Sequence, residues 1–426
     1  MYVTDDEKRI LDGARGAIAR LSMEFLIEMS EVAGAERLVD LDGTADMHTP
    51  WTSLVPHYEF PIEDLRALAE NGEKFKVPTF ANKTPLPICT IHDGWEYCDC
   101  PPHNTKEGHE RMMEREWMAL YKKMGMLTVH SCDYYLAMTY WPTQGQHCSW
   151  NESSAIPYCN AILGARTNID GCFMTAYLGK VPYYGMHVPE NRYATVVVDT
   201  ERRIGSDVEW DVFGFAVGEE CGLAVPALVN TGKPTTSQIL KFNTASNTGG
   251  SIAMYHIPGT TPEAPTLEYA LGGRKPKREI RIGEDRLRAS YEKLNSHRGD
   301  RVDMVSLGCP HYGMVDLMLL ARKLEGKKVR VPFWIMTIPW LFELAEREGF
   351  KKVFDDAGAT LVSGTCPAAM GGCPPGVRSL AVDSAKQAYY ITGCYPEEDN
   401  RLDLFYGTQD DCIDAAITGI WRGEWR

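Results

Sequence analysis

The stretch Val302-Asp-Met-Val-Ser-Leu-Gly-Cys-Pro-His311 joins an apolar run to a cysteine in a tight Gly/Pro turn. The run has the length and apolar character of a buried strand, and Gly308 and Pro310 mark its end. The stretch Ala359-Thr-Leu-Val-Ser-Gly-Thr-Cys366 repeats this arrangement. Two thiols that follow two strands can point into one cleft, and thiolates in a cleft suit a soft metal or an iron–sulfur cluster.

The region around these two stretches alternates strand-like and helix-like segments. The expected order is strand, helix, strand, helix, strand, at residues 302–307, 314–324, 329–335, 338–347 and 359–362. This alternation predicts a parallel sheet with helices on both faces, and therefore an α/β fold.

A chain of 426 residues is long enough for two or three domains. We expect an N-terminal α/β region at 1–132, a central loop-rich α/β region that holds substrate at 133–295, and a C-terminal α/β domain at 296–426. Outside the last of these, two helices stand out. A capping box at Thr4 and Glu7 predicts a helix that runs on to Phe25, and residues 279–294 read as a charged helix.

Composition and charge exclude several classes of function. The net charge of −14 and the isoelectric point of about 5.3 argue against non-specific binding of nucleic acid or anionic membrane. No apolar run approaches the roughly 18 residues of a membrane helix, and the N-terminus lacks a signal-peptide pattern, so we expect a cytosolic protein. Thirteen cysteines, an odd number at scattered spacings, predict reduced thiols rather than a disulfide framework.

A third cysteine stands in an equivalent position. Cys132 follows the strand-like run 127–131, so Cys132, Cys309 and Cys366 can meet in one crevice at the carboxyl ends of strands. Three thiolates would leave one iron without a protein ligand, free to act as a Lewis acid on a substrate hydroxyl. Three unrelated buried cysteines are an equally good interpretation of the residues alone. For Cys98 and Cys100 incidental thiols are the better interpretation, and Cys373 is a weaker ligand candidate than Cys366.

A loop rich in small polar residues could bind an anionic group. Ser153, Ser154, Thr167 and Asn168 offer short polar side chains, and Arg166 offers a forked donor for a carboxylate. The alternative is a capped surface helix with a solvated arginine. A lone lysine such as Lys386 is by itself more typical of a solvated helix position.

Taken together, the ordered motifs resemble the aconitase X family, specifically its large catalytic subunit. The segments that carry the resemblance are spread over nearly the whole chain. They are Thr79–Asn82, Ser131–Tyr135, Gly145–Trp150, Glu152–Asn160, Leu163–Asn168, Gly179–His187, His256–Pro265, Gly308–His311, Gly364–Pro367 and Ser384–Tyr390.

The resemblance implies an aconitase-like, multi-domain α/β architecture with parallel or mixed sheets flanked by helices and without the small swivelling domain, which we then expect on a separate small subunit. It implies an iron–sulfur cluster, [2Fe–2S] or [4Fe–4S], or a mononuclear iron. The implied ligands are Cys132, Cys309 and Cys366. The catalytic residues expected are Ser153, Ser154 and His311, and the alternative for the base is a serine of the separate small subunit. The expected substrate-binding residues are Asn82, Arg166, Thr167, Asn168 and Lys386.

Members of the family are hydro-lyases, so the resemblance implies dehydration of a small hydroxy acid. The first expectation is conversion of cis-3-hydroxy-L-proline to Δ1-pyrroline-2-carboxylate. Mevalonate 5-phosphate or another hydroxy acid is the alternative within this class. A non-catalytic iron–sulfur protein or a thiol redox protein is the alternative of another class, and iron and sulfide quantification separates them.

Overall fold

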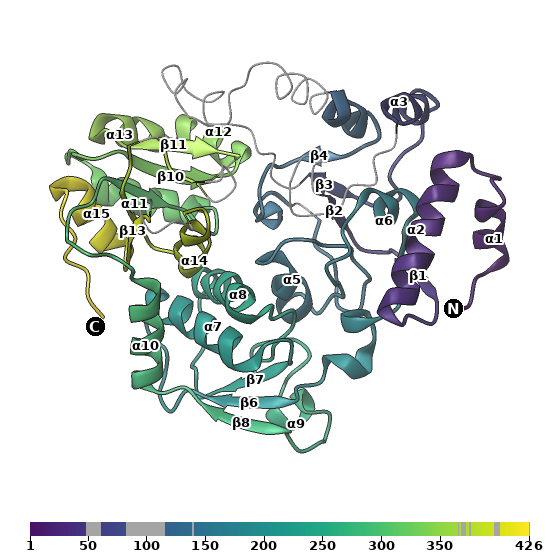
Figure 1. Cartoon of the computed structure of the whole chain (residues 1–426), viewed down its shortest axis with the longest axis horizontal. Helices are drawn as coiled ribbons and strands as arrows, with labels where there is room; N and C mark the ends of the chain where they lie inside the picture. The colour runs from purple at the N-terminus through teal and green to yellow at the C-terminus, as the bar shows by residue number, and fades with distance from the viewer. Residues whose placement is uncertain are drawn as a thin grey trace.

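The computed structural model describes residues 1–47, 61–81, 116–138, 140–364, 366–367, 372–374, 376–395 and 401–425. Figure 1 shows an N-terminal part with helices α1 and α2, a part built on strands β6 to β8, and a C-terminal part built on strands β9 to β13. The predictions for Asn82, Cys98 and Cys100 fall outside the described residues. The division at residues 132 and 295 stays a prediction.

The C-terminal part contains a five-stranded sheet in the order β11-β10-β9-β12-β13, in which every pair is parallel. Its strands are β9 (Met304–Leu307), β10 (Phe333–Thr337), β11 (Thr360–Ser363), β12 (Ser379–Val382) and β13 (Asp403–Tyr406). The helices are α11 (Met314–Leu324), α12 (Pro339–Arg347), α13 (Phe350–Ala357), α14 (Ala385–Gly393) and α15 (Gln409–Thr418). The predicted alternation of strands and helices is confirmed.

Both faces of this sheet are buried, which explains why its strands are mostly apolar. In β9, Met304 belongs to one core cluster and Val305 to another. In β10, Trp334 belongs to the first of these clusters and Ile335 to the second. Alternate residues therefore face two different cores, as expected for a parallel sheet covered on both sides.

The central part has a parallel sheet in the order β7-β6-β8, formed by β6 (Val196–Asp199), β7 (Pro226–Val229) and β8 (Arg278–Arg281). Helices α7 (Asp207–Cys221) and α8 (Thr236–Gly250) pack closely, because a Cβ at Gly250 would lie 1.8 Å from the Gly218 carbonyl oxygen. The remaining helices are α9 (Leu267–Ala270) and α10 (Glu284–Leu294). The prediction of one helix over 279–294 was wrong at its start, because that segment first completes β8.

The N-terminal part begins with the predicted capping box, since the Thr4 hydroxyl accepts a hydrogen bond from Glu7 N and the Glu7 carboxylate accepts one from Thr4 N. The single helix predicted through Phe25 was wrong. Gly13 and Gly16 adopt φ values of +88° and +84°, and these left-handed turns break the chain into α1 (Asp5–Leu11) and α2 (Ala17–Ala33). The apolar spacing from Ile10 to Phe25 does not by itself indicate this break.

Two small sheets complete the fold. Strand β1 (Leu38–Asp40) pairs antiparallel with β5 (Lys180–Pro182), and β2 (Ala45–Met47), β3 (Thr79–Ala81) and β4 (Leu127–Thr128) form a parallel sheet. The other helices here are α3 (Ile62–Glu70), α5 (Ala155–Pro157) and α6 (Phe173–Leu178). None of the helices in the described part of the chain has the length and apolar character needed to cross a membrane.

Candidate active site

The three cysteines singled out from the sequence all follow strands. Cys309 comes two residues after β9, Cys366 comes three residues after β11 in the same sheet, and Cys132 follows β4 of another sheet. Burial raises the pKa of the Cys309 thiol to about 12, the nearby Lys386 opposes this rise, and Cys366 adds to it. Lys386 also interacts with Cys132 and Cys309. The loops that follow β4 and β9 therefore meet at this lysine, with Cys366 beside Cys309.

These thiols match the chemistry of an iron ligand set, although their side chains are not arranged as one. Among the residues that the structure describes, no three His, Cys, Asp or Glu side chains form a group that could hold a metal ion. Cys132, Cys309 and Cys366 are partly exposed and form no disulfide within the described part of the chain, and thiolates are soft donors that suit iron. Because burial favours the protonated Cys309 thiol, metal binding there would release a proton. The assignment of the three ligands stays a prediction.

Asp133 connects the cysteine loop to the turn at His311. Its Oδ2 accepts hydrogen bonds from Cys132 Sγ at 3.3 Å and from the His311 backbone N–H at 2.8 Å. Its Oδ1 accepts from Tyr135 Oη and Ser154 Oγ, both at 2.7 Å. Four donors fix one buried carboxylate, so the two loops are held in one arrangement. Sequence reasoning missed Asp133, and its position directly after Cys132 was the available signal.

Two of the predicted catalytic residues belong to this arrangement. His311 is buried, and its Nδ1 lies 2.8 Å from Ser131 Oγ. The Ser154 hydroxyl has its proton directed at the Asp133 carboxylate, so this serine supports the loop as a donor. Their catalytic roles stay a prediction.

Lys386 lies beside Ser153 and Glu152. Its ammonium donates a hydrogen bond to Ser153 Oγ and lies 3.9 Å from Glu152 Oε2. Burial lowers the pKa of Lys386, but Glu152 and the thiols of Cys132 and Cys309 outweigh burial and raise the pKa overall. The lysine is thus a buried, charged group at the start of α14 rather than the solvated helix residue that its sequence alone suggested.

A buried ionic network fixes the chain immediately before Lys386. Lys241 Nζ from α8 lies 3.0 Å from Asp383 Oδ2 and also donates to the Asp383 carbonyl oxygen. Asp211 from α7 accepts a hydrogen bond from Ala385 N at 2.7 Å. Burial raises the pKa of Asp211 to about 7, against the opposing effect of Lys241. The position of α14, which packs on α8, therefore depends on charges from the central part of the chain.

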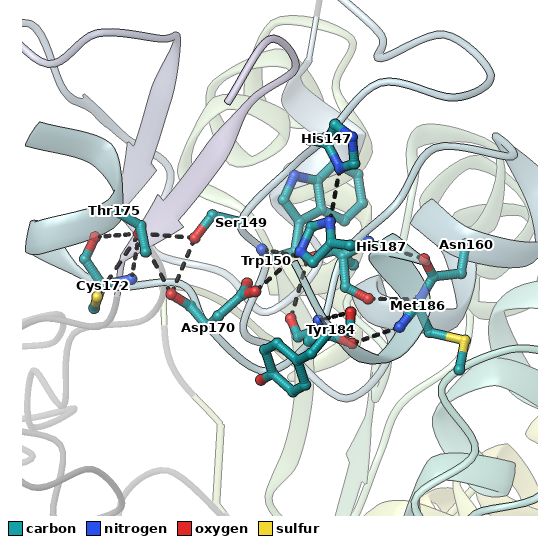
Figure 2. A network of polar contacts seen from close by, with 12 residues as sticks. His147, Ser149, Trp150, Asn160, Asp170, Cys172, Thr175, Tyr184, Met186 and His187 are labelled. Carbon is teal, nitrogen blue, oxygen red and sulfur yellow. Dashed lines mark hydrogen bonds and ion pairs between the residues drawn. The ribbon is translucent and has the colours of Figure 1, made fainter. Parts of the chain in front are cut away.

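Arg166, Thr167 and Asn168 belong to a second network, of which Figure 2 labels their partners Trp150, Tyr184 and His187. Thr167 Oγ1 accepts from Trp150 N at 2.7 Å, and Asn168 Nδ2 donates to the Tyr184 carbonyl at 3.1 Å. Arg166 Nη1 donates to the carbonyl of His187 at 3.2 Å. The two short side chains thus hold backbone segments in place. That these residues bind substrate stays a prediction.

Two histidines and an aspartate form the centre of this second network. His147 Nδ1 lies 2.9 Å from His187 Nδ1, and His187 Nε2 lies 3.1 Å from Asp170 Oδ2. Sequence reasoning assigned these three residues no role. The histidines occur in two of the quoted motifs, Gly145–Trp150 and Gly179–His187, and that co-occurrence was the available signal.

Stability should fall as the pH drops below about 6.5, because the fold keeps several histidines neutral. Burial lowers the pKa of His130 and His147 to about 4 in each case and also lowers that of His256. The unfolded chain then binds more protons than the native state between pH 6.5 and pH 4, so acid favours unfolding there. The midpoint of urea unfolding should decrease steadily across this range. A His130→Gln, His147→Gln double variant should show a shallower decrease, and an equal slope would contradict this origin.

Comparisons with known proteins identify the family and the fold of this chain. Three family models match in succession: the aconitase X first domain at residues 1–190, the second domain at 194–292 and the third domain at 302–418. The phosphomevalonate dehydratase large subunit of Thermococcus kodakarensis is 30% identical over 92% of this chain and 95% of its own length. The cis-3-hydroxy-L-proline dehydratase of Pseudomonas aeruginosa is 31% identical over 97% of this chain and 69% of its own length. A crystal structure of Thermococcus kodakaraensis aconitase X in its holo-form superposes with a TM-score of 0.79 at 28% identity, over 98% of this chain and all of that one.

Proposed function

The chain belongs to the aconitase X family and is a hydro-lyase, and from this premise we propose that it dehydrates a small hydroxy acid, with cis-3-hydroxy-L-proline as the first candidate. The observation that carries the proposal is the buried lysine beside a serine: Lys386 donates to Ser153 Oγ within electrostatic reach of Cys132 and Cys309.

Dehydration needs a base for the proton alpha to the carboxylate, and Ser153 is the residue proposed for it. A serine hydroxyl is a weak base at its ordinary pKa, but an adjacent ammonium favours its alkoxide form. Ser153 Oγ would take the proton, the C–H electron pair would form the new double bond, and the hydroxyl would leave with its bonding electrons as hydroxide. Return of the abstracted proton from Ser153 to this hydroxide would complete the water molecule and restore the base. The resulting enamine tautomerises to Δ1-pyrroline-2-carboxylate. Arg166 is proposed to hold the substrate carboxylate.

The proposed cofactor is an iron–sulfur cluster or a single iron held by Cys132, Cys309 and Cys366. When bound, it would supply Lewis acidity at the departing hydroxyl. The chain's own contribution is to fix the ligand loops, which Asp133 does by bonding both to Cys132 and to the His311 backbone.

A second candidate substrate is mevalonate 5-phosphate. It is favoured by the match in length to the Thermococcus protein, which is named a large subunit, whereas the chain covers 69% of the Pseudomonas dehydratase. The same comparison supports a separate small subunit as the partner of this chain.

Turnover of the two substrates in parallel tests these proposals. The chain, prepared without oxygen with iron and sulfide and combined with its small subunit, should convert cis-3-hydroxy-L-proline to the cyclic imine, followed by proton NMR. Iron should be lost in Cys132→Ala, Cys309→Ala and Cys366→Ala, but retained in a Cys221→Ala control in α7. Conversion of mevalonate 5-phosphate alone would replace the first candidate by the second. Iron-loaded protein that converts neither would overturn both.

A further inference from the structure

The Asp170–His187–His147 chain leads from a fully buried carboxylate to a half-buried imidazole (Figure 2). The side chains of His187 and Asp170 have no exposed surface, and Asp170 Oδ1 has no hydrogen-bond partner among the residues that the structure describes. Asp170 is thus a buried carboxylate whose side-chain hydrogen bonding is directed at one histidine. Burying a carboxylate costs free energy unless the group is paired and hydrogen-bonded. The contact with His187 is therefore the interaction that has to offset this cost.

The order of donors along this chain follows from the carboxylate. An ionised carboxylate only accepts hydrogen bonds, so His187 Nε2 must carry a proton and donate it. In a neutral His187 the other nitrogen, Nδ1, is then an acceptor, and the 2.9 Å contact requires His147 Nδ1 to carry a proton. His147 is left with a lone pair on Nε2. Asp170 therefore fixes the outer nitrogen of a residue two contacts away as an acceptor.

The outer histidine lies next to Arg166. Their backbones form a parallel bridge, and the Arg166 guanidinium donates to the carbonyl of His187. Arg166 lines a cavity of about 400 Å³ together with Gln144, Arg192, Tyr193, His256 and Glu263. Arg192 is held by Glu263 through a two-pronged ion pair, whereas Arg166 forms no ion pair with any carboxylate in the described part of the chain.

We propose that His147 Nε2 is a specificity-determining acceptor that recognises a ligand carrying a hydrogen-bond donor next to a carboxylate, with Arg166 holding the carboxylate. This inference rests on the proposed function and narrows its substrate class to imino and amino acids. In proline the ring nitrogen is a secondary ammonium that carries N–H groups, and it is bonded to the carbon that bears the carboxylate. Such a ligand matches the acceptor on His147 and the cation of Arg166. Asp170 and His187 act as positioning residues.

The electrostatic surroundings keep His147 neutral and able to accept. Burial, together with His187, Arg166 and Arg192 and against the opposing effect of Asp42, lowers the pKa of His147 to about 4. The Tyr183 ring packs against it edge-on. At neutral pH the free lone pair is therefore retained. A charged ammonium from a ligand gains a charge-assisted hydrogen bond there.

The tautomers can be measured without any turnover. In the full chain labelled with ¹⁵N-histidine, long-range ¹H–¹⁵N correlation spectra should show the Nε2–H tautomer for His187 and the Nδ1–H tautomer for His147. In Asp170→Asn the amide can donate as well as accept, so the order of donors is released and the His147 tautomer should become mixed. The opposite tautomer of His147 in the wild type would overturn the proposal.

A matched ligand pair tests the recognition itself. L-Proline and tetrahydrofuran-2-carboxylate share ring and carboxylate, but the second has an ether oxygen in place of the N–H groups. By calorimetry the wild type should bind L-proline about tenfold to hundredfold more tightly. His147→Leu should remove this preference, and Asp170→Asn should reduce it. A His297→Leu control should keep it, because His297 is exposed and bonds only locally to Gly299.

The remaining outcomes distinguish failure of the recognition by His147 from failure of the dehydratase proposal. Equal binding of the two ligands, no binding of either, or a preference that survives in His147→Leu would overturn the inference. Retained preference in a protein that converts neither hydroxy acid would overturn the dehydratase proposal alone. Turnover of cis-3-hydroxy-L-proline with an unchanged KM in His147→Leu would overturn the recognition role and leave the proposed function standing.

Discussion

Replacing Lys241 by methionine is expected to lower the free energy of unfolding by about 3–5 kcal/mol, because it leaves a buried carboxylate without its cation. The side chains of Lys241 and Asp383 are 9% and 6% exposed, and their charged atoms lie 3.0 Å apart. Tyr312 Oη also donates to Asp383 Oδ2, so the carboxylate would keep a neutral partner only. Urea unfolding at pH 7 measures the effect.

Two further variants show whether the loss of stability comes from breaking the Lys241–Asp383 ion pair or from the mere removal of a lysine. Lys352→Met removes a lysine whose partner Asp356 is largely exposed, and it should leave the free energy of unfolding almost unchanged. Lys241→Met combined with Asp383→Leu removes both charges and should recover most of the lost stability. A Lys241→Met protein as stable as the Lys352→Met control would refute this account of the network.

Replacing Lys386 by methionine should lower kcat by about 10²–10³-fold on the substrate that the wild type converts, as for loss of one preorganised donor at a reacting group. The change removes the ammonium from Ser153 Oγ and leaves the serine with its ordinary basicity. Because the serine hydroxyl remains in place, KM should change less than kcat.

The controls separate chemistry from folding. Lys323→Met, which removes an exposed lysine paired with Asp410, should leave kcat unchanged. Lys386→Arg keeps the charge and should retain more activity than Lys386→Met, although the planar guanidinium fits a point-charge site imperfectly. Unchanged kcat in Lys386→Met, with iron content equal to that of the wild type, would exclude Lys386 from the reaction.

The sequence by itself determined the C-terminal sheet and the position of its cysteines. Residues 302–307 and 359–362 are short, mostly apolar and closely followed by glycine, and they overlap β9 and β11 of a parallel sheet. The prediction of these strands succeeded because a strand that is buried on both faces can be recognised from its own apolar composition. The turn at Cys309 follows from the same local rule, since Gly308 adopts a φ of +96°. The ordered motifs also identified the family.

Only the tertiary structure decided which polar groups act together. Lys386 meets Ser153 across 233 residues of sequence, and Asp133 meets the His311 backbone across 178. Asp170 and His147 lie 17 and 40 residues from His187 in the sequence, and no local period links them. The physical reason is that hydrophobic periodicity reports how one segment is buried, whereas a hydrogen bond between loops depends on how the sheets that carry those loops are packed. The sequence alone therefore suggests a solvated lysine at position 386, whereas the fold buries its ammonium group.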